Sequence, residues 1–346
     1  MEDMNGLSSN RREGASEERL SEIRQAAATA SGLPAASGAG GKAATALTGY
    51  YGLPLLKPPQ WKWEVPGYFF AGGAAGAAAV IAGAAQVCGA NPRLVRDARW
   101  IAAVGGAVSP ALLIADLGRP ERFLNMLRVL KLQSPMSVGS WTLAVFSSAA
   151  AAALFFDASL RGRSIPAVMI GAGSQAIATL TGMPLATYTG VLLGATAVPV
   201  WSKNAAELPV HFAASAVGSA VSLLELKNHE SDRALNALGI GSAVVETLMS
   251  LRLVTKPEPA LKALKTGKAG WLSRAGAVLS GPLPLILRLL AGSSGARRSR
   301  QLRRVAAAST VAGSALTRYA WVSSGRASTA DPALPLQLPS AETGGG

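Results

Sequence analysis

Charged residues are scarce in this chain, and those that occur are gathered in short groups. They make up 15% of the sequence, whereas an average soluble protein carries roughly 25%. Between the groups lie stretches of about 18 to 24 residues with almost no charge, the helical length that crosses a hydrocarbon core of about 30 Å. Strands would need an alternating pattern, which is absent. Because lipid offers the backbone no hydrogen-bond partner, the sequence predicts an all-α, polytopic integral membrane helical bundle.

Aromatic residues are also scarce, at 5% of the chain, although its net charge is +14. Proteins that bind single-stranded nucleic acid interleave basic residues with aromatic side chains on which the bases stack. Here the Lys and Arg residues stand in loops between apolar stretches, as membrane topology requires. We therefore expect no nucleic-acid partner, and we expect the basic surface to meet anionic lipid head groups.

Cysteine and histidine are nearly missing. The chain has one cysteine, Cys88, and two histidines, His211 and His229. A single cysteine excludes an intramolecular disulfide and an all-cysteine metal site. A haem held by two histidines would need both at a common depth, and His229 lies in a charged loop. We expect neither haem nor metal in this chain.

The apolar stretches predict about eight spans, or nine if residues 165–202 cross twice rather than forming one long or broken helix. They cover residues 65–88, 99–117, 139–160, 165–202, 206–226, 233–252, 270–292 and 302–323. Loops on both sides carry similar numbers of Lys and Arg, so the positive-inside rule leaves the orientation open. The polar segments 1–48 and 327–346 are predicted to be disordered tails of a transmembrane domain at 49–326.

Ionisable groups beside a span are costly in lipid, so they indicate where function lies. Glu64 opens the first span and Asp116 closes the second, which places both carboxylates at one membrane face. Tyr68 and, at the start of the third span, Trp141 lie toward the same face. Such a cluster can bind an amphipathic ring and exchange protons with it, because burial changes the pKa of a carboxyl group.

The loop at 118–138 lies at this face too and contains Arg119 and Arg122. These arginines either contribute to the same site or pair with Asp116 and hold the loop. Tyr188, partway into another span, either binds a quinone carbonyl or bonds a neighbouring helix.

Several other polar residues are predicted within the spans. Glu225, Glu246 and Arg318 need partners that the sequence does not identify. Arg288 is expected to extend to the membrane interface, and His211 is expected to be a satisfied polar residue rather than a ligand.

Three stretches of the sequence resemble the NrfD/polysulfide reductase membrane-subunit family. The first runs from Tyr50 to Gly73 and the second from Asp116 to Trp141, including the long loop motif Asp-Leu-Gly-Arg-Pro-Glu-Arg. The third runs from Ala186 to Trp201. The likeness is strong over residues 50–201 and looser to about 326.

The resemblance implies a membrane anchor subunit of a respiratory oxidoreductase in the bacterial inner membrane. Such a subunit binds quinone or quinol, has no redox centre of its own, and exchanges electrons with an extrinsic iron-sulfur partner, often beside a molybdopterin catalytic subunit. Carried over by motif position, Asp116 and Glu64 would be the catalytic residues. The quinone would be bound by Tyr68, Arg119, Arg122, Trp141 and Tyr188.

Two other functions remain open from the residues alone. A secondary transporter would show broken helices in two repeated halves, and the Gly- and Pro-interrupted stretch 165–202 is compatible with one such break. A non-catalytic membrane scaffold would tolerate changes at the carboxylates but not in the basic loop.

Overall fold

The computed structural model describes residues 56–159 and 164–329, and these residues are helical with no strand. This agrees with the predicted all-α bundle. The predicted tail at 1–48 and residues 330–346 of the second tail lie outside the described residues. Residues 327–329 belong to the last helix. The helices form a unit that runs from Pro59 to Ser328.

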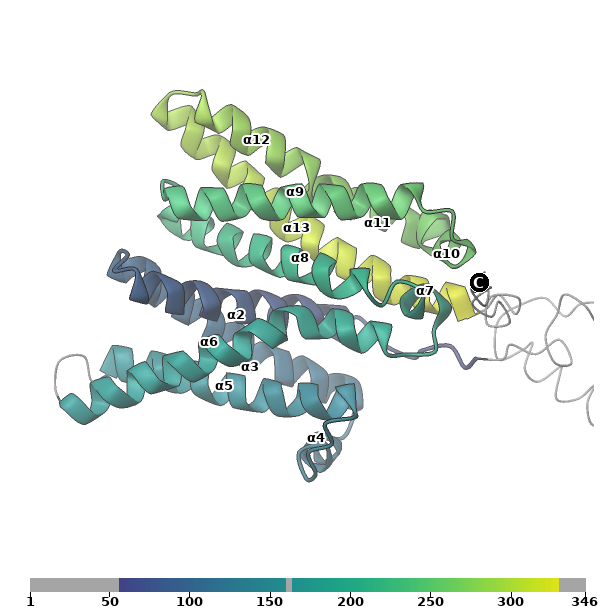
Figure 1. Ribbon diagram of the computed structural model, residues 1–346, viewed down its shortest axis with the longest axis horizontal. Coiled ribbons are helices and arrows are strands. Elements are labelled where there is room, and N and C mark those ends of the chain that lie inside the picture. The colour runs from purple at the N-terminus through teal and green to yellow at the C-terminus, as the bar shows by residue number, and fades with distance from the viewer. Residues whose placement is uncertain (1–55, 160–163, 330–346) are drawn as a thin grey trace, which may run out of the picture. The chain divides into compact units, whose positions relative to one another are not determined.

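The helices follow one another with short connections (Figure 1). In chain order they are α2 (Glu64–Val87), α3 (Pro92–Leu117), α4 (Pro120–Met126), α5 (Pro135–Ser159), α6 (Ile165–Gly194), α7 (Pro199–Ser202), α8 (Glu207–Leu224), the π-helix η2 (Glu225–His229), α9 (Arg233–Thr255), the 3-10 helix η3 (Pro259–Leu261), α10 (Lys262–Lys265), α11 (Gly267–Ser280), α12 (Pro282–Gly292) and α13 (Ala296–Thr329).

Within the described residues, 7 helical segments are long and apolar enough to cross a membrane. They correspond to the first seven predicted spans. The predicted eighth span at 302–323 lies inside α13, which has 34 residues but is not among these seven segments. Its hydropathy is lowered by polar residues such as Ser314 and Arg318, which are buried against other helices.

The ambiguous stretch at 165–202 forms one continuous helix, α6, which contains Pro184 and is followed by the short α7. It therefore provides one candidate span rather than two. It also does not provide the broken helix that a transporter would need there. A break does occur later, at Gly281, where α11 ends and α12 begins.

Two groups of helices pack side by side (Figure 1). In the first, α2 contacts α3 and α6, and α5 contacts the same two helices. In the second, α9 contacts α8, α11 and α12. Contacts of α8 with α2 and α6 join the groups. We call the first group the α2–α6 bundle.

Glycines permit the closest helix contacts. A Cβ placed on Gly76 of α2 would lie 2.6 Å from the carbonyl oxygen of Gly182 on α6, and a Cβ on Gly182 would meet Gly76 in the same way. A Cβ on Gly190 would lie 2.6 Å from the backbone of Leu208 at the start of α8. Small residues therefore let these backbones approach, as they commonly do in membrane bundles.

Local sequence determines both ends of α3, the helix that carries Asp116. At its start, the side chain of Asn91 accepts a hydrogen bond from the backbone N–H of Arg93 (2.9 Å), and Pro92 occupies the first helical position. At its end, Gly118 adopts a left-handed conformation with φ of 70°. Glycine takes this conformation readily because it has no Cβ. The helix thus ends directly after Asp116 and Leu117.

Candidate functional site

The start of α2 and the end of α3 lie together, as the topology of the sequence predicts. The backbone N–H of Lys62 donates a long hydrogen bond to Asp116 Oδ1 (3.4 Å). Glu64 lies at the first position of α2, two residues further on. Both predicted carboxylates are therefore at one end of the α2–α6 bundle, and both are partly buried.

The two predicted tyrosines lie deeper at the same end. Tyr68 and Tyr188 are 3% and 8% exposed. The Tyr188 hydroxyl donates to the carbonyl oxygen of Pro135 at the start of α5 (2.7 Å). Its ring packs where a Cβ on Gly139 would otherwise lie. Tyr188 thus makes the helix-to-helix bond that was one of its two predicted roles.

Among the described residues, several buried polar atoms at this end have no hydrogen-bond partner, and two of them differ in kind. They are Oε2 of Glu64, an acceptor, and Nε1 of Trp141, a donor near the start of α5. Buried polar atoms in folded proteins are nearly always satisfied, so each exception calls for an explanation. A bound molecule with both donor and acceptor groups would satisfy such atoms.

The predicted arginines lie outside this cluster. Arg119 directly precedes the short α4, Arg122 lies in its first turn, and both are exposed. Arg122 donates to the carbonyl oxygen of Leu117 (3.4 Å) rather than to the carboxylate of Asp116. The structure therefore separates the two arginines from the buried tyrosines. The arginines lie at the surface, at the same end of the bundle.

A second polar cluster lies between α8, α9 and α11. His211 Nε2 is 3.1 Å from Glu246 Oε2, and the Ser280 hydroxyl donates to the same oxygen at 3.1 Å. The other carboxylate oxygen, Glu246 Oε1, is buried without a partner among the described residues. Ser280 is the last residue before the helix break at Gly281, so the break lies next to this carboxylate.

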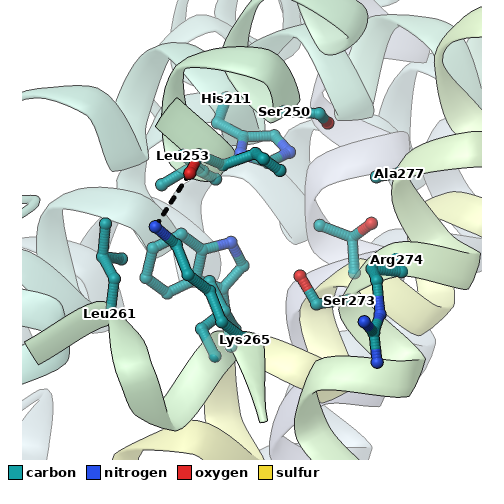
Figure 2. A pocket seen from close by; sticks show the side chains of 12 residues that line it. His211, Ser250, Leu253, Leu261, Lys265, Ser273, Arg274 and Ala277 are labelled. Atoms are coloured by element: carbon teal, nitrogen blue, oxygen red, sulfur yellow. Dashed lines mark hydrogen bonds between the residues drawn. The ribbon is translucent and has the colours of Figure 1, made fainter. Parts of the chain in front are cut away.

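A cavity of about 200 Å³ opens beside this pair (Figure 2). Its wall comes from α8, α9, η3, α10, α11 and α13, and the residues that line it are His211, Ser250, Leu253, Val254, Leu261, Leu264, Lys265, Ser273, Arg274, Ala277, Thr317 and Trp321. Most of the wall is apolar. Sequence reasoning identified His211 as a polar residue, but it did not predict this cavity because the lining residues come from distant parts of the chain.

The family model described as Polysulphide reductase, NrfD, matches residues 56–327, which is most of the chain and includes both polar clusters. The chain belongs to the NrfD family. Members of this family are membrane subunits of respiratory oxidoreductase complexes. This chain is accordingly a multi-pass membrane protein of that kind, which associates with oxidoreductase subunits. No curated protein matches its sequence.

Arg318 lies where the two helix groups of this NrfD-family chain meet. It is fully buried and donates from Nε to the carbonyl oxygen of Phe69 on α2 (3.1 Å). Its Nη1 donates to the hydroxyls of Ser215 on α8 and Ser314 on α13, both at 2.6 Å. Arg318 therefore satisfies its guanidinium with hydroxyl and carbonyl oxygens.

Arg288 does not extend to the interface as the sequence suggested. It is 1% exposed and forms a two-pronged ion pair with Glu225, whose carboxylate is completely buried. A Cβ on Gly239 would collide with the guanidinium, so this glycine provides the room for Arg288. The prediction was wrong because the buried carboxylate of Glu225 accepts two charge-assisted hydrogen bonds from Arg288 within the bundle.

Sequence reasoning missed a third polar cluster at the opposite end of the α2–α6 bundle. Arg99 donates to Gln175 Oε1 (2.9 Å) and Gln86 Oε1 (2.6 Å) and forms an ion pair with Asp157 (3.1 Å). These contacts join α3, α6, α2 and α5. The available signal was the presence of Arg99 and Gln175 in otherwise apolar stretches.

The sequence predictions about metal binding and about the depth of the two histidines can be compared with the structure. Within residues 56–159 and 164–329, no group of three or more His, Cys, Asp or Glu side chains is arranged to hold a metal ion. His211 belongs to the start of α8 and His229 to the end of η2. The two histidines therefore occupy opposite ends of one helical segment.

Proposed function

We propose that this chain is a quinone-reactive anchor subunit of a respiratory oxidoreductase in the bacterial cell membrane. Quinone or quinol binds at the Glu64–Asp116 end of the α2–α6 bundle. The observation that supports this most directly is the pair of buried, unpartnered atoms, Glu64 Oε2 and Trp141 Nε1. A quinone carbonyl accepts hydrogen bonds, and a quinol hydroxyl donates and accepts them. One ligand class therefore provides partners for both kinds of atom.

The surrounding residues have distinct roles in this proposal. Tyr68, which is buried one turn after Glu64 on α2, lines the ring site, and Tyr188 positions α5 against α6 through Pro135. The carboxylates of Glu64 and Asp116 exchange protons with the bound quinol, as acids and bases placed beside a reacting group do.

Electrons are exchanged between the quinone and a partner protein. Iron–sulfur clusters are held by several cysteine ligands, and this chain has one cysteine. The clusters therefore belong to an extrinsic iron-sulfur subunit, beside a molybdopterin catalytic subunit where one is present. The exposed arginines at 119 and 122 lie at the same end as the quinone cluster, and complementary charge would guide an acidic partner to that face.

The test is a mild-detergent purification of the tagged full chain, followed by identification of co-purifying proteins and by assays of iron and extracted quinone. An iron-sulfur partner together with bound quinone supports the proposal. A chain that purifies from its native membrane without partner, iron or quinone contradicts it.

A further inference from the structure

We propose that the cavity between α8, α9, α11 and α13 is a second binding site, which takes a single hydroxylated aromatic ring of the hydroquinone type. The identity of the ligand rests on the proposed quinone function, whereas the cavity and its polar groups do not. This site is separate from the Glu64–Asp116 end, because its walls come from the other helix group.

Size limits the ligand to one ring. An apolar protein cavity of about 150 Å³ binds benzene, so a cavity of about 200 Å³ accommodates a ring with small substituents. The rings of Trp321 and His211 meet edge to face in this wall, with centroids 6.4 Å apart. These two flat side chains and the leucines of α9, η3 and α10 form the apolar wall that a ring requires.

The cavity offers hydrogen bonds that the protein itself leaves unused. Thr317 is 5% exposed and lines the cavity, and its hydroxyl, which lies against Gly276 of α11, has no partner within the described residues. His211 uses Nε2 on Glu246, and its other ring nitrogen makes no hydrogen bond within the same residues. When Nε2 carries the proton toward the carboxylate, Nδ1 is an acceptor. A phenolic hydroxyl donates to such a nitrogen.

The charges around the cavity favour a neutral ligand over an anionic one. Lys265 directs its ammonium group to the backbone carbonyl oxygens of Val254 (2.9 Å) and Lys256 (2.8 Å), at the end of α9. Figure 2 shows the guanidinium of Arg274 extending away from His211, while Ser273 lies on the cavity side. Neither cation is directed at the ligand space, so a hydroquinone fits better than a phosphate or carboxylate group.

The test uses the full chain with its co-purifying partners, photolabelled with a short-chain azido-benzoquinone under reducing conditions. Labelled peptides are identified by mass spectrometry. We expect label on α11 and α13 around Ala277 and Thr317, in addition to label at the Glu64–Asp116 end. Ala277→Leu fills the cavity and is expected to lower labelling of α11 and α13 at least tenfold, and Thr317→Val to lower it severalfold.

A control on the same helix is Val278→Leu, which adds a single methylene group at a side chain that is 52% exposed. It should leave labelling unchanged, and size-exclusion chromatography checks that each variant folds. Label confined to the Glu64–Asp116 end, or equal labelling in Ala277→Leu and Val278→Leu, overturns the second site alone. Label confined to α11 and α13 supports the second site and contradicts the site proposed in the α2–α6 bundle. No label at either place overturns both.

Discussion

Arg288 and Glu225 form a fully buried ion pair, in which two guanidinium nitrogens lie 2.5 and 2.7 Å from the two carboxylate oxygens. The pair connects α12 to the start of η2, where the α-helical hydrogen-bond pattern of α8 ends. Two parallel hydrogen bonds between charged groups give the contact both strength and a defined geometry. The pair thus holds the end of α8 against α12.

Removing one partner of this pair should be more damaging than removing both. Arg288→Met leaves the Glu225 carboxylate buried without its cation, and we expect the free energy of unfolding to fall by about 3–5 kcal/mol. The double variant Glu225→Met/Arg288→Met removes both charges and should lie closer to the wild type. Unfolding in mixed detergent micelles measures this order, and a double variant less stable than Arg288→Met would contradict it.

The contact between α2 and α6 should be sensitive to a single methyl group. Gly76→Ala places a Cβ 2.6 Å from the carbonyl oxygen of Gly182, so the helices must move apart, at a cost of about 1–3 kcal/mol. Gly173→Ala is the control on α6, because its new Cβ meets no atom within 4 Å. Alanine there should stabilise the helix by about 0.5–1 kcal/mol. Equal melting temperatures for the two variants would refute this explanation.

Tyr188 is expected to matter more for stability than for quinol reactivity. Tyr188→Phe removes the hydrogen bond to Pro135 and should cost about 0.5–1.5 kcal/mol, while electron transfer from quinol changes little. Thermal unfolding and quinol oxidation by the purified complex distinguish the two effects. A large loss of oxidation at unchanged stability would instead show that the hydroxyl touches the quinone.

Asp116 and Glu64 should be required for quinol-dependent electron transfer. Asp116→Asn keeps an oxygen that can accept from Lys62 but loses the charge, and we expect at least about a tenfold loss of rate, as for other proton-transfer groups. Glu64→Gln should behave alike. Glu121→Gln, an exposed residue of α4, serves as the control. Unchanged activity in Asp116→Asn would rule out its catalytic role.

Much of the fold and the meeting of Glu64 with the Asp116 end followed from the sequence. A span that must be apolar and about 20 residues long is visible in composition alone. Two consecutive spans necessarily bring the start of the first and the end of the second to one face. The motif at 116–128 likewise indicated the family before any contact was known.

The exact partners of the buried charges were decided only by the tertiary structure. Glu225, Glu246, Arg288 and Arg318 each stand in an apolar stretch, and nothing in their spacing distinguishes the pair Glu225–Arg288 from its alternatives. Pairing depends on how helices rotate and pack, which is a property of long-range contacts. The sequence likewise does not predict which hydroxyls surround Arg318, because they come together only when α8 packs against α13.

The sequence by itself therefore determined that this protein is a helical membrane bundle of the NrfD family, with two carboxylates at one face, because lipid imposes length and polarity on each segment separately. The tertiary structure decided that Arg288 is buried, that Arg119 and Arg122 are exposed, and that a cavity lies beside His211. These features arise where side chains from distant helices meet, and the pattern within a single segment contains no information about its neighbours.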